Sequence, residues 1–385
     1  MPVSGLARFY HAMGWGRQIK RLAAFALTAL LAGCASYDDP YYVHSVWRPA
    51  DASDRQATVF FLTDRKPNPG WLPDKFDRVR DGASCGVVHA EIPVARLPAG
   101  PALFAFEPES TRETISCGNG NTELARHVAT VAHAQNCSAV LIYVHGFDTG
   151  FETAVLRAAQ LGSDTQWPCA VAAFSWSSAG DKGRYDSDRA NAVAAEPLFA
   201  DFLRALAGEG LKANIIAHSM GAKLVIEALA SSKVSADHVI LAAPDIGTEE
   251  FPTLVHDAAP HLRRLTIYAS NEDVALAISR RLNGGVARLG RDPAAARDVA
   301  DVIDAGDAPA DFAGHEYYGL SYEMLADMSL ALAGETAEQR LTSYKAQPPT
   351  LQRAEDGTYR LAVKDMRAPD IFTRFLRWLV AAIAD

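Results

Sequence analysis

The stretch Ala217-His218-Ser219-Met220-Gly221 decides how the rest of the chain is interpreted. It follows an apolar run without helical period, at residues 213–217, and it precedes helical spacing at residues 224–229. A serine at the apex of a strand-turn-helix unit needs small neighbours two residues away, because strand and helix cross closely there. Gly221 meets this requirement, and Ala217 meets it in a relaxed form. The stretch predicts a nucleophilic Ser219 that is lifted out of the sheet, and an ordinary helix N-cap is the simpler alternative.

Strands and helices alternate around this stretch. Near-continuous apolar runs, typical of strands covered on both faces, occur at residues 140–144, 170–176, 213–217, 239–243, 265–269 and 299–303. Helices are expected at 152–161, 186–206 and 371–383, strands without an intervening helix at 58–62 and 85–93, and a further short strand at 104–106. Residues 348–365 show no pattern. The order predicts the α/β class, a mostly parallel central sheet with helices on both faces and an antiparallel N-terminal edge.

The first 33 residues are expected to be a signal peptide. A basic head precedes a short apolar run at residues 22–31, and Leu31-Ala32-Gly33 leads directly into Cys34. This order resembles the bacterial lipoprotein signal, which implies that Cys34 becomes the lipidated N-terminus. An ordinary signal peptide or membrane anchor is the alternative. Because Ala35 and not aspartate follows the cysteine, the resemblance implies attachment to the outer membrane, facing the periplasm.

The chain without its signal peptide is acidic. The 385 residues carry a formal net charge of −9, and removing the four positive charges of residues 1–33 brings this charge to −13. Such a protein is a poor nucleic-acid binder, so no nucleic-acid partner is expected. Residues 34–57 are polar and aromatic with little periodicity and are expected to form a tether. Residues 58–385 then form the folded domain, which is long enough to bury a substantial core.

Four cysteines follow Cys34, and export to an oxidising compartment allows them to form two disulfides. Sequence alone permits three connectivities. We favour Cys137 with Cys169, because each precedes an apolar run and neighbouring parallel strands would place these starts side by side. Cys85 would then pair with Cys117, and four buried thiols are the alternative. No cysteine or histidine spacing suggests a metal site, and no cofactor is expected.

Polar residues follow the carboxyl ends of the predicted parallel strands, where ligands collect in open α/β sheets. Serine is a poor nucleophile unless a histidine accepts its proton, and that histidine needs a carboxylate to hold its tautomer. We therefore predict Ser219 as nucleophile, His315 as general base and Asp273 as acid. Asp245, which ends the preceding strand, is the alternative acid. The structural alternatives are a surface loop for His315 and a turn or helix cap for Asp245.

A tetrahedral intermediate needs two N–H donors, and losing one costs about 3 kcal/mol. Met220 is expected to supply the first donor, because it directly follows the nucleophile. The second is expected from Phe147 or Gly146, in the turn after the strand at residues 140–144. Gly146 also lets the backbone approach a substrate closely. The structural alternative for His145-Gly146 is a tight strand-to-helix turn, which is compatible with this role. His218 is expected to pack beside the serine turn.

Six further motifs accompany the Ser219 stretch: Thr63-Asp64-Arg65, Val144-His145-Gly146-Phe147, Phe174-Ser175-Trp176, Ala243-Pro244-Asp245, Tyr268-Ala269-Ser270 with Asp273, and Gly314-His315. In this combination, over roughly residues 58–320, the chain resembles a bacterial α/β-hydrolase family, the domain of unknown function nine hundred. The resemblance implies the α/β-hydrolase fold with Ser219, Asp273 and His315 as the triad. It implies no substrate, and alanine at position 217 is normal for this family.

These residues predict an envelope-anchored serine hydrolase that acts on carboxylic esters through an acyl-enzyme. Its expected partners are a small ester substrate and, through the lipid anchor, the membrane. The loop at residues 177–187 is polar and no long apolar lid is recognisable, which favours a small or soluble ester over bulk lipid. The fold alone does not select the substrate. The alternative function is a non-catalytic lipoprotein that binds an envelope component or a partner protein.

Overall fold

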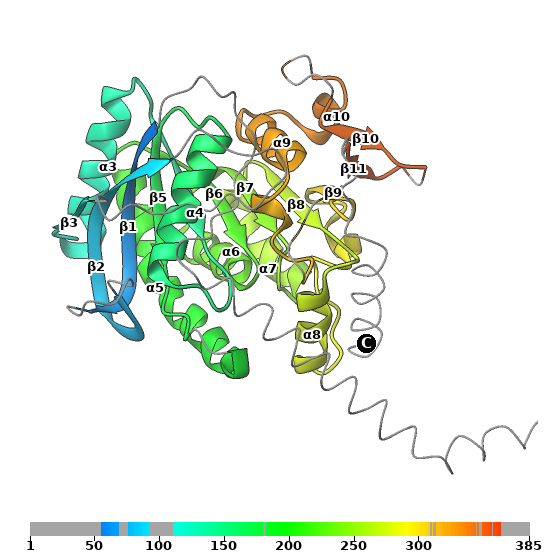
Figure 1. Cartoon of the computed structure of the whole chain (residues 1–385), viewed down its shortest axis with the longest axis horizontal. Coiled ribbons are helices and arrows are strands. Elements are labelled where there is room, and N and C mark those ends of the chain that lie inside the picture. The colour runs from blue at the N-terminus through cyan, green and yellow to red at the C-terminus, as the bar shows by residue number, and fades with distance from the viewer. Residues whose placement is uncertain are drawn as a thin grey trace, which may run out of the picture.

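An eleven-stranded sheet forms the centre of the computed structural model (Figure 1). The structure describes residues 55–68, 76–92, 111–179, 182–308, 310, 313–343, 345, 349–355 and 357–362. The strands lie in the order β10-β11-β9-β8-β7-β6-β4-β5-β1-β2-β3. Their bounds are β1 Arg55–Pro67, β2 Phe76–Ile92, β3 Thr111–Ile115, β4 Ala139–Val144, β5 Ala170–Ser175, β6 Lys212–His218, β7 Ala236–Ala242, β8 Leu265–Ala269, β9 Asp301–Asp304, β10 Leu351–Arg353 and β11 Tyr359–Leu361.

The middle of the sheet is parallel from β1 through β5, β4, β6, β7, β8 and β9. At the N-terminal edge, β2 runs antiparallel to β1 and β3 runs antiparallel to β2. Parallel strands need crossover connections, and the helical spacing between the apolar runs supplies them. The predicted α/β class and its antiparallel N-terminal edge are therefore confirmed.

Helices cover both faces of the sheet, because its central strands are apolar on both sides. In β6, Ile215 faces one core and Ile216 faces the other. The first core includes side chains of α3, α5, α6 and α7, and the second includes side chains of α4 and α9. The helix bounds are α3 Thr122–Ala134, α4 Phe151–Asp164, α5 Tyr185–Gly208, α6 Met220–Ser232, α7 Phe251–Ala258, α8 Val274–Leu282, α9 Tyr322–Leu332 and α10 Ala337–Arg340.

The structure differs from the expected elements at both ends of the chain. β1 already begins at Arg55, inside the expected tether, and β9 begins at Asp301, two residues later than expected. The strands β10 and β11 form an edge within the stretch that showed no pattern, and three-residue strands are too short to produce a recognisable period. The signal peptide with Cys34, the strand at 104–106 and the closing helix at 371–383 lie outside the described residues.

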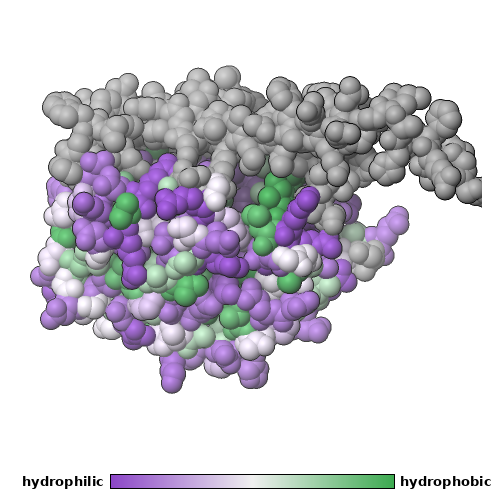
Figure 2. All heavy atoms as spheres, turned by 90° about the horizontal axis from the view of Figure 1, so that it is seen from below, coloured by the Kyte–Doolittle hydropathy of each residue, from purple (hydrophilic) through white to green (hydrophobic). Residues whose placement is uncertain are grey.

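One face of the described surface is mostly polar (Figure 2). Figure 2 shows one face on which hydrophilic residues predominate and hydrophobic ones form small separate spots. Among the residues that the structure describes, no helix combines the length and apolar character needed to span a bilayer.

Two disulfides join segments that are adjacent in the sheet. Cys137 pairs with Cys169, and the strands that follow them, β4 and β5, are parallel neighbours. Cys85 pairs with Cys117, which lies just after β3, the neighbour of β2. The predicted pairing is confirmed, because the register of the sheet places both pairs of Cα atoms within 6 Å, at 5.8 and 5.3 Å.

Replacing both Cys137 and Cys169 by serine is expected to lower the free energy of unfolding by about 3 to 4 kcal/mol, because the bond constrains 32 residues of the unfolded chain. Urea denaturation of the variant and the wild type measures this difference. The bond between Cys85 and Cys117 spans the same number of residues and serves as the matched control. A loss below about 1 kcal/mol for one pair alone would contradict the loop-entropy argument.

Candidate active site

Ser219 lies at the sharp turn between β6 and α6, as the surrounding stretch predicts. Its backbone has φ 50° and ψ −119°, a region that residues other than glycine rarely adopt. The Ser219 N–H donates to the carbonyl oxygen of Ala242 at 3.0 Å. The Ser219 carbonyl oxygen accepts from the N–H groups of Ala222 and Asp245, each at 3.1 Å. The neighbouring segment and the first turn of α6 thus hold the serine in its strained conformation.

Two glycines are required where the serine turn packs against its surroundings. A Cβ on Gly221 would overlap the carbonyl oxygen of His145, so strand and helix cross too closely for any side chain. A Cβ on Gly146 would lie 2.8 Å from the Cβ of Ser219 and 2.9 Å from Nδ1 of His218. The turn expected to carry the second oxyanion donor is therefore in direct contact with the serine turn.

The structure brings Asp273 and His315 together at the carboxyl end of β8. Oδ2 of Asp273 lies 2.7 Å from Nδ1 of His315, and Asp273 is fully buried. The other carboxylate oxygen, Oδ1, accepts the N–H of Leu276 at 2.9 Å as the N-cap of α8. The carboxylate is thus held at both oxygens, by the imidazole and by the positive end of a helix.

The loop that carries His315 is attached to the start of α8. The N–H of Val274 donates to the carbonyl oxygen of Ala313 at 2.9 Å. Gly314 has φ +68°, and a Cβ there would lie 3.0 Å from the carbonyl oxygen of Glu272. A residue with a side chain would be strained at this position, so Gly314 lets the loop bring the imidazole to the carboxylate.

A buried aromatic and ionic cluster supports the imidazole of His315. The His218 ring packs against the rings of His315 and Tyr318, at centroid distances of 4.6 and 4.4 Å. Arg157 of α4 lies over the Tyr318 ring at 5.3 Å and donates to Glu316 at 3.0 Å. Burial first, and then the charges of His315 and Arg157, hold the pKa of His218 well below its usual range. His218 is therefore a neutral packing residue between the serine turn and the His315 ring.

The turn after β4 is supported by the buried His145. Its ring stacks on Trp176 at 4.8 Å, and its two nitrogens lie 2.7 Å and 3.1 Å from the carbonyl oxygens of Gly146 and Trp176. The Trp176 indole N–H donates back to the His145 carbonyl oxygen at 2.9 Å. Burial, and secondarily the charge of Arg65, lowers the pKa of His145 to about 3. A neutral imidazole thus fixes the backbone that leads into Gly146 and Phe147.

Asp245, the alternative acid, belongs to a different network. Arg288 Nε donates to its Oδ1 at 2.6 Å, and the Ser279 hydroxyl donates to the same oxygen at 2.6 Å. The Tyr185 hydroxyl donates to Oδ2 at 2.7 Å. Within the described part of the chain, no contact of Asp245 reaches His315. The geometry therefore favours the other aspartate as the partner of the imidazole.

Replacing Asp245 by asparagine is expected to affect stability more than chemistry. The variant leaves Arg288, whose side chain is only 7% exposed, without its carboxylate, and breaking a buried pair in this way costs about 3 kcal/mol. Urea denaturation measures the free energy of unfolding, and kcat per titrated active site measures the chemistry. A fall in kcat of about 10⁴-fold at unchanged stability would instead assign the role of acid to Asp245.

The arrangement contains the parts of a nucleophilic site. Because Nδ1 of His315 donates to the carboxylate of Asp273, Nε2 is the nitrogen that can accept a proton. The N–H groups at the start of α6, beginning with Met220, directly follow the serine. Within the residues that the structure describes, no group of three or more His, Cys, Asp and Glu side chains is placed to hold a metal ion.

Comparison with known proteins gives one family match. The model of an alpha/beta hydrolase family of unknown function, DUF900, matches residues 119–316. A hormone-sensitive lipase from a metagenome library is 13% identical with a TM-score of 0.33, over 51% of this chain and 78% of its own. An esterase from Pyrobaculum calidifontis is 12% identical with a TM-score of 0.34, over 86% and 98%. Esterase B from Lactobacillus rhamnosis is 12% identical with a TM-score of 0.35, over 86% and 99%. No curated protein matches the chain.

Proposed function

Because the chain belongs to the DUF900 family of α/β hydrolases, whose function is unknown, we propose a function from the chain's own site: a serine hydrolase that cleaves carboxylic esters. The observation that carries this proposal is the 2.7 Å contact between Asp273 and His315, at the same edge of the sheet as the strained Ser219 turn. A serine on such a turn becomes a useful nucleophile beside a histidine held in this way.

In the proposed reaction, His315 accepts the hydroxyl proton of Ser219 while Oγ attacks the ester carbonyl carbon. The carbonyl π electrons move to oxygen, and their return breaks the bond to the alcohol oxygen, which takes the proton from His315. Water then attacks the acyl-enzyme with the same proton transfers, releasing the acid and restoring Ser219. Asp273 stabilises the imidazolium formed in each half-reaction and keeps the imidazole in one tautomer.

The negative oxygen of each tetrahedral intermediate needs donors that are already in place. The N–H of Met220 is suited to this role, because it opens α6 and gains from the positive end of the helix dipole. We assign the second donor to the turn at Gly146 and Phe147. This assignment is supported by the contact of Gly146 with Ser219 and by the rigid His145 and Trp176 pair beneath the turn.

The cell envelope is the proposed location of this hydrolase. The sequence around Cys34 supports a lipid anchor in the outer membrane, with the domain facing the periplasm. The bonds Cys85–Cys117 and Cys137–Cys169 support an oxidising compartment. Metabolic labelling with radioactive palmitate, compared between the wild type and Cys34→Ser, tests the anchor.

A fluorophosphonate probe tests the proposed function directly, since it reacts with serines that a neighbouring histidine activates. We expect stoichiometric labelling of the folded protein, followed by hydrolysis of p-nitrophenyl esters. A series of rising acyl-chain length then measures the size of the acyl site. A folded sample that neither labels nor hydrolyses would contradict the proposal and favour a non-catalytic binding protein.

A further inference from the structure

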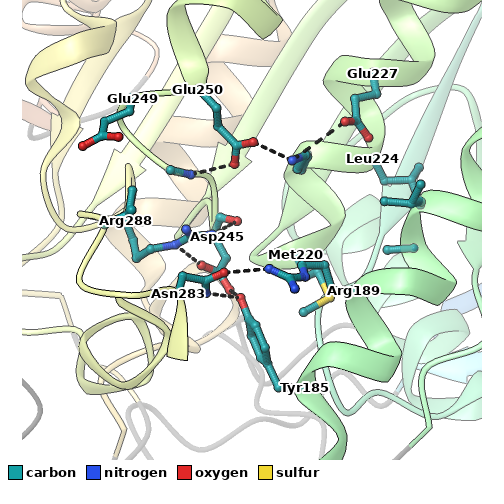
Figure 3. A pocket seen from close by; sticks show the side chains of 15 residues that line it. Tyr185, Arg189, Met220, Leu224, Glu227, Asp245, Glu249, Glu250, Asn283 and Arg288 are labelled. Atoms are coloured by element: carbon teal, nitrogen blue, oxygen red, sulfur yellow. Dashed lines mark hydrogen bonds and ion pairs between the residues drawn. The ribbon is translucent and has the colours of Figure 1, made fainter. Parts of the chain in front are cut away.

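A pocket of about 290 Å³ lies beside the serine turn, between α5, α6 and the segments 245–250 and 283–288 (Figure 3). Met220, whose N–H is the proposed oxyanion donor, forms part of its wall. Asp245 forms another part, and its backbone N–H holds the carbonyl oxygen of Ser219 at 3.1 Å. A molecule bound in this pocket would therefore contact Met220, which follows the proposed nucleophile in the chain, and Asp245, whose backbone is hydrogen-bonded to it.

Five of the seven charged side chains of the pocket wall are paired with one another (Figure 3). Arg189 pairs with Asp186 outside the wall, and the exposed Glu249 has no ion-pair partner among the described residues. Arg288 and Asp245 form a buried pair at 2.6 Å. Lys223 of α6 lies 2.6 Å from a carboxylate oxygen of Glu250 and 3.9 Å from one of Glu227. The wall thus presents fixed donors beside fixed acceptors, and opposite charges largely cancel.

This pairing selects the kind of ligand. In the buried part of the wall, a charged ligand would have to compete with one member of the Arg288–Asp245 ion pair, and breaking a buried pair is costly. Hydroxyl groups do not have this difficulty, because each one donates and accepts a hydrogen bond. A ligand that carries several hydroxyl groups can therefore bond to paired cations and carboxylates without separating them.

Arg288 has hydrogen-bonding capacity left for such a ligand. It is 6% exposed, and its Nε and Nη2 donate to Oδ1 and to the carbonyl oxygen of Asp245 at 2.6 and 2.8 Å. Within the described part of the chain, Nη1 has no hydrogen-bond partner, and it is not among the buried polar atoms that lack one, so it is open to the pocket. Arginine carries five N–H donors, so Nη1 is available to donate a hydrogen bond to a ligand oxygen in the pocket.

Apolar side chains complete the wall. Met220 and Leu224 of α6 and Val193 of α5 belong to the lining of the pocket. They can pack against the C–H groups that sugars and polyols carry beside their hydroxyl groups. A volume of about 290 Å³ is at the small end for ligand pockets, so it suits a single ring-sized group.

We propose that this pocket binds an uncharged, hydroxyl-rich group, a monosaccharide or glycerol unit, and that the natural ester is an acylated polyol whose alcohol portion occupies the pocket. Only the claim about the natural ester rests on the proposed hydrolase function. Binding of the polyol itself needs no reaction.

The test compares substrates and blocks the pocket. Methyl β-xylopyranoside acetate and glycerol triacetate carry the polyol, and p-nitrophenyl acetate does not. Val193→Trp fills the pocket from the rim, where this side chain is 53% exposed, so the core is not disturbed. The matched control is Val299→Trp, at a 48% exposed valine outside the pocket. The quantity compared is kcat/KM for the polyol ester divided by kcat/KM for p-nitrophenyl acetate. We expect Val193→Trp to lower this ratio by about tenfold or more. We expect the control to leave it unchanged.

Binding is measured separately by saturation-transfer NMR on Ser219→Ala, with methyl β-xylopyranoside and glycerol as probes and 1-butanol as the comparison. Transfer to one polyol and not to the other identifies the source of the hydroxyl groups. The inference is overturned if neither polyol shows saturation transfer and Val193→Trp leaves the kcat/KM ratio unchanged. Fluorophosphonate labelling of the same protein would still support the hydrolase function. A third result separates the two proposals: the protein does not label, a polyol shows saturation transfer, and Val193→Trp abolishes that transfer. This result overturns the hydrolase function and retains the binding pocket.

Discussion

Replacing Ser219 by alanine is expected to lower kcat for a p-nitrophenyl ester by on the order of 10⁵-fold and to abolish fluorophosphonate labelling. The substitution removes only Oγ. The Cβ that packs toward Gly146 remains, and alanine occupies the strained position with the same backbone hydrogen bonds. The loss of activity would therefore report the missing nucleophile and not a rearranged turn. Intact-protein mass spectrometry after labelling, together with initial rates, measures both effects.

Ser232→Ala is the matched control for this experiment. Ser232 is 7% exposed, compared with 4% for Ser219, and it lies at the other end of the same helix, α6. We expect this variant to label and to hydrolyse as the wild type does. Labelling that persists in Ser219→Ala would show that another serine is the nucleophile, and the assignment of the triad would then be wrong.

Asp273→Asn is expected to lower kcat by about 10⁴-fold with little effect on stability. The N–H of Leu276 donates to Oδ1 of Asp273, so the asparagine oxygen keeps this position as the helix cap, where asparagine is as good as aspartate. The asparagine NH₂ group then takes the place of Oδ2, which lies 2.7 Å from Nδ1 of His315. Nδ1 therefore faces a hydrogen-bond donor where the wild type has an acceptor. The imidazole must change its tautomer, and Nε2 no longer accepts the serine proton.

Asp292→Asn is the matched control, because it makes the same substitution at another helix N-cap. Asp292 accepts the N–H of Ala294 at 3.4 Å as the N-cap of a short 3₁₀ helix, and it is exposed. We expect wild-type kcat in this control and unchanged free energies of unfolding in both variants, measured by urea denaturation. An Asp273→Asn enzyme that retains most of its kcat would show that the carboxylate bonded to His315 only holds the loop.

The parallel part of the fold could be predicted because its signals are local. A strand buried on both faces has to be apolar at almost every position, and the runs that became β4, β5 and β6 meet this condition. The pairing of Cys137 with Cys169 could be predicted because each cysteine precedes such a run, and neighbouring strands place these positions side by side. The edge strands β10 and β11 carry three residues each, and such short strands leave no period to recognise.

The serine turn could be located for the same kind of reason. A backbone with positive φ between a strand and a helix needs Gly221 and a small residue at 217 within five consecutive positions, and these requirements are visible in the sequence. The cluster that supports the imidazole was not predicted. Glu316 is adjacent to His315, but Arg157 lies 159 positions away from Glu316 in the chain, on a helix that shows only an ordinary amphipathic pattern.

The sequence by itself determined the α/β class, the serine turn and the set of polar residues at the strand ends, because each depends on patterns within a few turns or strands. Only the tertiary structure decided which aspartate meets the imidazole. Asp245 and Asp273 both end a parallel strand, and they differ in what lies opposite them: Arg288 for the first and His315, 42 positions along the chain, for the second. Such contacts depend on the order of strands in the sheet and on the paths of the loops beyond them, and these are properties of the whole chain.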